Sequence, residues 1–182
     1  GARPAQDGAG RTWAELDFVT GTKKGFVMLN LFTGAAAAAL ALSGAAAAQD
    51  YSLSPAFGSV SLSGGFSPDP YTVSLRSGGS IDAGSRIGGS CRGYVANAPD
   101  FRLQFSPGSL PLILSVASSA DTTLVVNGPD GSWYCDDDGG DGLNPSLRFG
   151  SPMGGQYDIW VGTYGNASMQ NATLHISELS SQ

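Results

Sequence analysis

The fold is decided by residues 121–163, which read DTTLVVNGPDGSWYCDDDGGDGLNPSLRFGSPMGGQYDIWVGT. The β-branched and apolar run at 122–126 is typical of a half-buried strand. The NGPDG segment at 127–131 supplies turn chemistry, because glycine tolerates positive φ, proline presets φ and aspartate bonds its own backbone. A second strand resumes at 132–135. The pattern therefore predicts a β-hairpin over 122–135.

An acidic loop follows this hairpin. The segment DDDGGD places four carboxylates within six residues, namely Asp136, Asp137, Asp138 and Asp141. Such charges repel one another unless water solvates them or they share a cation. Oxygen ligands on a glycine-rich loop suit Ca²⁺, but the spacing departs from the EF-hand pattern because Gly140 stands at the fifth position. Composition leaves two interpretations open, a calcium site and a solvated turn.

A strand of alternating polarity closes the stretch. Residues 157–162 read YDIWVG, and their period of two places Asp158 and Trp160 on the face opposite the apolar side chains. Asp158 is either a further ligand of the acidic loop or an ordinary solvent-facing residue. Asp121, where the stretch begins, is another candidate ligand. Trp133 and Trp160 are candidates for stacking on a glycan, as in carbohydrate-binding modules, and the alternative places both in the protein core.

The series DTTLVVNGPDGSWYCDDD, LNPSL and GGQYDIWVGTY resembles the bacterial pre-peptidase C-terminal domain family. It is most similar to small secreted members that carry a disulfide-linked cysteine with APDF and YDIWVGTY segments, here at 98–101 and 157–164. The resemblance spans residues 91–178. It implies a jelly-roll-like β-sandwich that often binds calcium and usually accompanies a secreted protease. Peptidase labels arise in this family by that association, so such an activity has to be tested against residues.

The other segments predict further short strands separated by turns. Polar and apolar residues alternate at 71–76 and at 101–105, whereas 112–117 reads as a more fully buried strand and 172–177 as the last one. Residues 81–90 are loop-like, and no part of this region shows helical periodicity of useful length. About nine short strands at regular spacing predict an all-β fold, a jelly-roll-like antiparallel β-sandwich.

The N-terminal part carries an export pattern. Residues 1–22 are polar and without sustained periodicity, and we interpret them as disordered or as over-extended translation. Two lysines then precede an apolar run that ends in an A-x-A site, so residues 23–48 predict a secretory signal peptide cleaved after Ala48, to within a few residues. The alternative is a transmembrane anchor, but polar residues interrupt the run, which lacks the ~20 strongly apolar residues that a spanning helix prefers.

Cleavage leaves residues 49–182 as a single domain, secreted or periplasmic, with no membrane span. This part holds 12 acidic and 5 basic residues and no lysine, a net charge of about −7. Nucleic acid requires clustered cations, so it is excluded as a partner. The same excess of acidic residues gives no support for binding to anionic lipid. The expected partner is an extracellular protein or a polysaccharide.

Two cysteines, Cys91 and Cys135, lie in the exported part. An even number in an oxidising compartment favours a disulfide, and the alternatives are free thiols or a metal pair. The bridge would close a loop of about 45 residues, which contributes ~4 kcal/mol in the chain-entropy model. It would also anchor the residue immediately before Asp136, so the acidic loop would be tied down.

No catalytic apparatus is visible in the sequence. His175 is the only histidine, which excludes an HExxH motif, and no Gly-x-Ser-x-Gly elbow occurs. The leading hypothesis is a secreted, non-catalytic β-sandwich module that binds Ca²⁺ and acts in extracellular binding or adhesion, or as an accessory to a secreted protease. The alternatives are a secreted peptidase and a structural cell-envelope protein without a ligand.

Overall fold

The computed structural model describes residues 49–182, so the expected polar segment 1–22 and signal peptide 23–48 lie outside the described residues. The described part forms eleven strands and one short helix. The elements are β1 (Ser59–Ser63), β2 (Tyr71–Ser77), β3 (Ile81–Asp82), α1 (Ala83–Arg86), β4 (Tyr94–Val95), β5 (Phe101–Ser106), β6 (Leu112–Ala117), β7 (Thr122–Asn127), β8 (Trp133–Asp136), β9 (Ser146–Phe149), β10 (Gly155–Thr163) and β11 (Gln170–Ser177). No helix within this range is long and apolar enough to cross a membrane.

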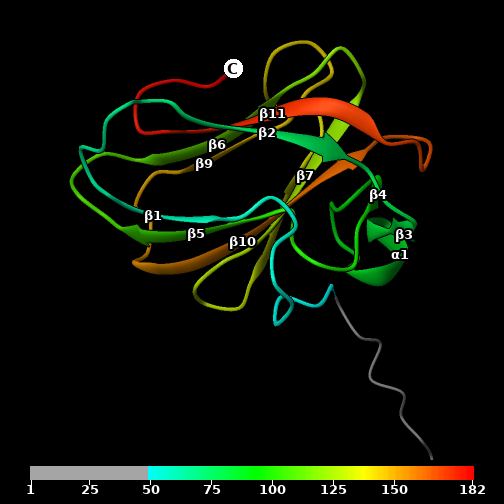
Figure 1. The fold of residues 1–182 in the computed structure, drawn as a ribbon, viewed down its shortest axis with the longest axis horizontal. Coiled ribbons are helices and arrows are strands. Elements are labelled where there is room, and N and C mark those ends of the chain that lie inside the picture. Colours follow the sequence, from blue (N-terminus) through cyan, green and yellow to red (C-terminus); the bar gives the residue numbers. More distant parts are fainter. Residues whose placement is uncertain (1–48) are drawn as a thin grey trace, which may run out of the picture. The chain divides into compact units, whose positions relative to one another are not determined.

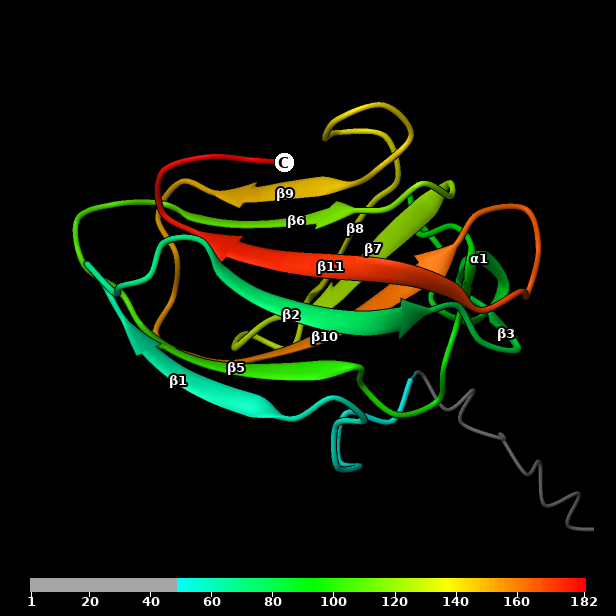
Figure 2. The same cartoon turned by 45° about the horizontal axis from the view of Figure 1, so that its top comes forward.

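The strands form two sheets that lie face to face (Figures 1 and 2). One sheet has the order β2-β11-β6-β9 and is antiparallel throughout. The other is built on antiparallel β5-β10-β7-β8. β1 joins it parallel to β5, and β4 with β3 continues the sheet where β5 ends. The chain moves between the two four-stranded sets as in a jelly roll, which confirms the predicted all-β sandwich.

Strand alternation builds the main core between the sheets. The apolar face of β10 contributes Tyr157, Ile159 and Val161, each with 0% exposure. Tyr157 lies opposite Leu103 of β5, and Val161 lies opposite Leu124 of β7. Each such buried side chain stabilises the fold by roughly 1.5–3 kcal/mol relative to an exposed one. The inward face expected from the period of two is therefore confirmed.

A second, smaller apolar cluster covers the opposite face of β7 and β10. Its buried members are Ala83, Cys91, Val95, Val125 and Trp160. Residues 81–90, expected to be loop-like, supply part of this cover as β3 and α1. Asp82 starts the helix because its carboxylate accepts a hydrogen bond from the Ser85 N–H at 3.2 Å. The outer face of the larger sheet is thus buried here, not solvated.

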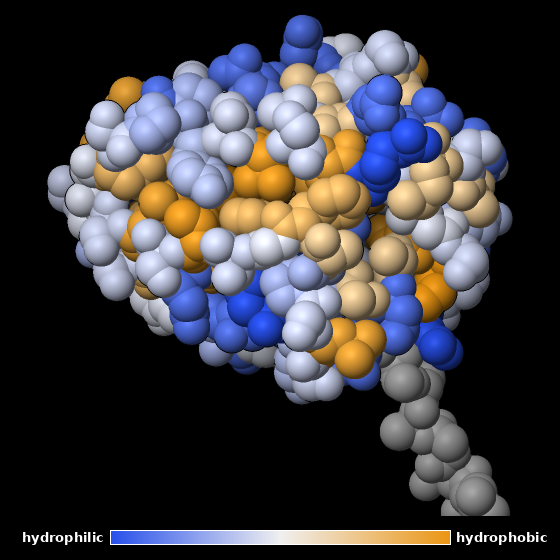
Figure 3. Space-filling view, viewed as in Figure 1, coloured by the Kyte–Doolittle hydropathy of each residue, from blue (hydrophilic) through white to orange (hydrophobic). Residues whose placement is uncertain are grey.

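The edge strands of the two sheets, β1 and β2, lie on the same side of the sandwich (Figure 2). Five partly buried side chains pack against the main core near this side, namely Phe57, Val60, Leu62, Phe66 and Tyr71. Figure 3 shows apolar residues gathered across the middle of the same face. Each of these two strands is paired on one side only, so unpaired backbone groups border the apolar band.

Candidate functional site

The acidic loop lies between β8 and β9, and Asp136 closes it. Oδ2 of Asp136 accepts hydrogen bonds from the N–H groups of Gly139 and Ser146, both at 2.8 Å. These bonds join the two ends of the loop. The predicted ligand Asp136 is therefore already used, through this oxygen, to set the shape of the loop.

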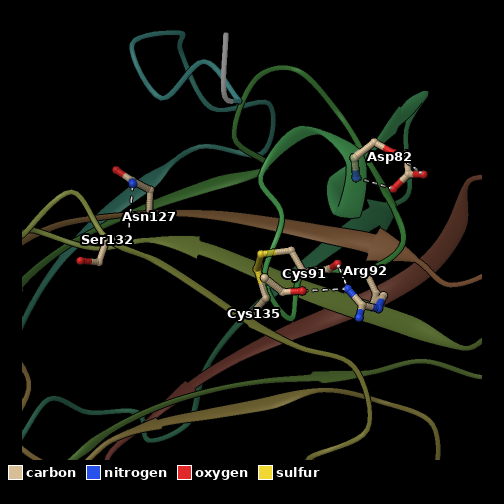
Figure 4. The surroundings of a disulfide bond; sticks show 8 residues. Asp82, Cys91, Arg92, Asn127, Ser132 and Cys135 are labelled. Atoms are coloured by element: carbon tan, nitrogen blue, oxygen red, sulfur yellow. Dashed lines mark hydrogen bonds between the residues drawn. A yellow bond between two sulfur atoms is a disulfide. The ribbon is translucent and has the colours of Figure 1, made fainter. Parts of the chain in front are cut away.

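The disulfide predicted between Cys91 and Cys135 is present, with a Cα–Cα distance of 4.9 Å (Figure 4). It joins the segment before β4 to β8. Nη1 of Arg92 donates to the Cys91 carbonyl at 2.7 Å and to the Gly89 carbonyl at 3.1 Å. Since Cys135 immediately precedes Asp136, the bridge fixes the residue from which the acidic loop departs.

Asp121 lies against the acidic loop, just before β7. Its carbonyl accepts from the Tyr164 N–H at 3.1 Å, and the neighbouring Thr122 N–H donates to the Leu143 carbonyl at 3.2 Å. The pKa of Asp121 is raised, first by burial and then by the charges of Asp138 and Asp137. Asp137 and Asp138 therefore lie near enough to Asp121 for their charges to act on it. We call Asp121, Asp137 and Asp138 the acidic cluster.

One atom of the acidic cluster has no partner. Oδ1 of Asp121 is buried and makes no hydrogen bond within the described residues, although the side chain as a whole is only half-buried. A buried acceptor without a donor costs roughly 1–3 kcal/mol. The negative charge of Asp137 and Asp138 raises that cost further.

Asp141 lies on a different part of the loop. It lines an open pocket of about 340 Å³ whose other walls are Val116, Ala117, Ser118, Asn144, Ser181 and Gln182. Nδ2 of Asn144 donates to the carbonyls of Ser118 and Asp141, at 3.0 and 3.3 Å. The Asp141 N–H donates to the Gln182 carbonyl at 3.3 Å. The backbone around Asp141 is thus held in place, while its exposed carboxylate faces solvent.

The structure corrects the expectation for Asp158, which is not brought to the acidic loop. Its Oδ1 lies 2.6 Å from Nε of Arg102, and its Oδ2 accepts from Nε2 of Gln156 at 2.7 Å. Asp158 of β10 lies opposite Asn127 of β7. Asn127 is the last residue of β7, whereas Asp121 immediately precedes the first. Asp158 has 2% exposure, so its charge is neutralised by Arg102 inside the fold.

The glycan-stacking expectation is wrong for Trp160. This side chain has 0% exposure and lies beneath Cys91 and Val95 in the second cluster. Trp133 is half-buried and packs on Trp160, with ring centroids 5.4 Å apart. A ring with no exposed face cannot stack on a sugar, so the alternative that placed Trp160 in the core holds.

Within residues 49–182, no three Asp, Glu, His or Cys side chains converge as a ready metal centre. The six predicted ligands therefore divide. Asp137 and Asp138 lie near enough to Asp121 for their charges to raise its pKa, whereas Asp136 closes the loop, Asp141 lines the pocket and Asp158 pairs with Arg102. Two neighbours of the acidic cluster are exposed, and one of them, Leu143, was not anticipated. Tyr164 and Leu143, bonded through their backbones to Asp121 and Thr122, have 45% and 58% exposure.

Asp100 is a second residue that sequence reasoning missed. Along β10, pairing with β5 ends at Ile159 and pairing with β4 begins at Thr163. The N–H of Val161 falls in this gap, and Oδ2 of Asp100 accepts it at 2.7 Å. Asp100 has 2% exposure, and burial raises its pKa to about 7 despite the hydrogen bond from Val161, which lowers it. Its place in the APDF segment, directly before an alternating strand, is the available sequence signal.

His175 lies on the outer face of the four-stranded sheet, opposite Thr72 and Ser115. Burial lowers the pKa of its imidazole. Its Nδ1 has no hydrogen-bond partner in the described part of the chain, and the hydroxyl of Ser115 accepts from the Gln182 N–H at 3.1 Å. No carboxylate therefore orients this imidazole, and no Ser-His-Asp triad is assembled among residues 49–182.

Comparisons with known proteins add little to this picture. No protein-family model matches the chain, and no curated protein matches it. Among solved structures, the chain is similar to the crystal structure of Aeromonas hydrophila PliG, a periplasmic lysozyme inhibitor of g-type lysozyme. The identity is 11% and the TM-score 0.34, with 66% of this chain and 96% of that chain covered. A similarity of this size carries no argument about fold or function.

Proposed function

We propose that the exported domain is a non-catalytic binding module whose acidic cluster takes one Ca²⁺. The observation that carries the proposal is the buried, unpartnered Oδ1 of Asp121 beside the charges of Asp137 and Asp138. A divalent cation at this place supplies the missing partner for that oxygen. It also removes the repulsion that raises the pKa of Asp121.

The oxygen ligands that the acidic cluster offers are of the type that calcium prefers. Carboxylate oxygens are hard ligands, and Ca²⁺ accepts six to eight of them in flexible geometry, with water completing the shell. Gly139, Gly140 and Gly142 follow the two loop aspartates, and Gly142 has a positive φ of 65°. Such a backbone lets Asp137 and Asp138 move toward Asp121 when the ion binds. We expect affinity in the range of extracellular modules, roughly 10⁻⁴–10⁻³ M.

The role of the ion in this proposal is to fix a contact surface. Tyr164 and Leu143 expose large side chains next to the acidic cluster, and exposed apolar groups beside polar ones mark interaction sites. The module binds an extracellular protein or polysaccharide there, either in adhesion or as an accessory to a secreted protease. The resemblance to the pre-peptidase C-terminal family supports this role, as does the export pattern of residues 23–48.

Isothermal titration of the exported protein with Ca²⁺ tests the proposal. We expect about one site per chain in the unaltered protein and none in an Asp137→Asn, Asp138→Asn double variant. Asp130→Asn is the matched control, because Asp130 is exposed at the far end of the β7–β8 hairpin and the asparagine oxygen can still accept the turn hydrogen bond from the Ser132 N–H. Absence of calcium binding in the unaltered protein favours a structural envelope protein. Hydrolysis of a protein substrate that depends on His175 favours a peptidase.

A further inference from the structure

Gln49 is the first described residue, and its side chain is buried in the domain. It has 1% exposure, and Nε2 donates a hydrogen bond to the Ala96 carbonyl. Oε1 is buried without a partner in the described part of the chain. Glutamine is mostly exposed in folded proteins, so a fully buried one at this position calls for a specific role.

The segment after Gln49 is held on the same surface. The Asp50 N–H donates to the Asn97 carbonyl at 3.1 Å, and the Ala56 N–H donates to the Pro99 carbonyl at 2.9 Å. Nη2 of Arg102 donates to the carbonyls of Tyr51 and Leu53, at 2.5 and 3.1 Å. These contacts begin at the residue that follows the A-x-A site ending at Ala48. The expected mature N-terminus is therefore seated on the domain from its first residue.

We propose that Gln49 is a modification site, converted after export to an N-terminal pyroglutamate that stays buried against Ala96. Cleavage after Ala48 frees the α-amine of Gln49. The amine lone pair attacks Cδ of the same side chain, the N–Cδ bond forms and the Cδ–Nε2 bond breaks. Nε2 leaves as ammonia with the proton lost by the amine. Nothing is oxidised or reduced, and the reaction needs no co-substrate.

The lactam fits this site for two reasons. Nε2, which donates to the Ala96 carbonyl, leaves as ammonia, and the lactam N–H formed from the α-amine is the one donor that replaces it. The lactam also removes a positive charge. A free α-ammonium beside a buried side chain pays a desolvation cost that a neutral lactam avoids. The proposal depends on export of the domain but not on calcium binding.

Intact-mass analysis of the exported protein tests this proposal. The full chain is expressed from an added initiator methionine in a host that secretes through signal peptides. The expected mass is that of residues 49–182 with the Cys91–Cys135 disulfide, less one ammonia. Pyroglutamyl aminopeptidase should release the terminal residue after denaturation, and sequencing should then begin at Asp50. The native protein should resist the enzyme because the ring is buried.

A Gln49→Ala variant is the control. It should be cleaved at the same site, keep a free α-amine and lose no ammonia. A free glutamine amine in the unaltered protein once its mass is constant, or a terminus at another residue, overturns the proposal. Ready release of pyroglutamate from the native domain overturns its buried placement. Calcium titration of the same sample separates this result from the function proposed above.

Discussion

The guanidinium of Arg102 lies 2.6 Å from the carboxylate of Asp158, between adjacent strands β5 and β10. Arg102 also donates to two carbonyls of the N-terminal segment, so one side chain links that segment to the larger sheet. Asp158 has 2% exposure. Arg102 balances its charge, and Gln156 donates a further hydrogen bond to it.

Arg102→Ala should destabilise the domain by about 3–5 kcal/mol, because it leaves a buried carboxylate unpaired. Urea unfolding measures the change. Arg148→Ala is the control, since Arg148 is exposed on β9, and it should change stability by no more than about 0.5 kcal/mol. Equal effects of the two substitutions contradict the assigned role of the pair.

The raised pKa of Asp100 should make the stability of the fold depend on pH in a specific way. Its pKa rises from 3.8 to about 7 in the folded protein, so the folded state binds more protons than the unfolded state between these values. Its contribution to stability is full below pH 3.8 and is lost as the pH rises through 7. The shift corresponds to at most about 4 kcal/mol.

Asp100→Asn keeps an acceptor for the Val161 N–H and cannot ionise. We expect this variant to be more stable than the unaltered protein at pH 8 and to lack the loss between about pH 4 and 8, by at most the amount given above. Denaturant unfolding at a series of pH values measures it. Burial lowers the pKa of His175, so this imidazole reduces the stability of the fold as the pH falls below its ordinary pKa of 6.5. The effect is the same in the variant and in the unaltered protein, so it cancels in their comparison. Parallel pH profiles for the two proteins contradict the account.

The Cys91–Cys135 disulfide closes a loop whose ends are 44 residues apart. In the chain-entropy model its loss costs about 4 kcal/mol. A Cys91→Ala, Cys135→Ala double variant should therefore lose most of the stability of a small domain. Thermal unfolding of this variant against the unaltered oxidised protein measures it. An unchanged melting temperature contradicts a stabilising role.

Periodicity predicted the sandwich and the inward face of β10 because a period of two is a local property of the chain. It could not predict what covers the other face. Asp158 and Trp160 point away from the main core, yet both are fully buried. Their cover comes from Arg102 and from Cys91 and Val95, which are distant in sequence. A side chain that points away from the main core is therefore not necessarily exposed to solvent.

The candidate site was predicted in part for the same reason. The clustering of Asp137 and Asp138 is local and visible in the sequence. The approach of Asp121 depends on how the segment before β7 packs against Tyr164 and Leu143. The parallel pairing of β1 with β5 is likewise a long-range contact, which no alternation pattern encodes.

We expect Ca²⁺ to bind at the acidic cluster and to stabilise the fold. Scanning calorimetry of residues 49–182 and of their Asp121→Asn variant, with chelator and then with millimolar Ca²⁺, tests this most directly. In chelator, Asp121→Asn should be at least as stable as the unaltered protein, because the repulsion from Asp137 and Asp138 is removed.

In calcium the order should reverse. The unaltered protein should gain stability by mass action, about 1.4 kcal/mol when the free ion reaches ten times its Kd, and Asp121→Asn should gain little. No rise in the melting temperature of the unaltered protein, or an equal rise in Asp121→Asn, contradicts the account.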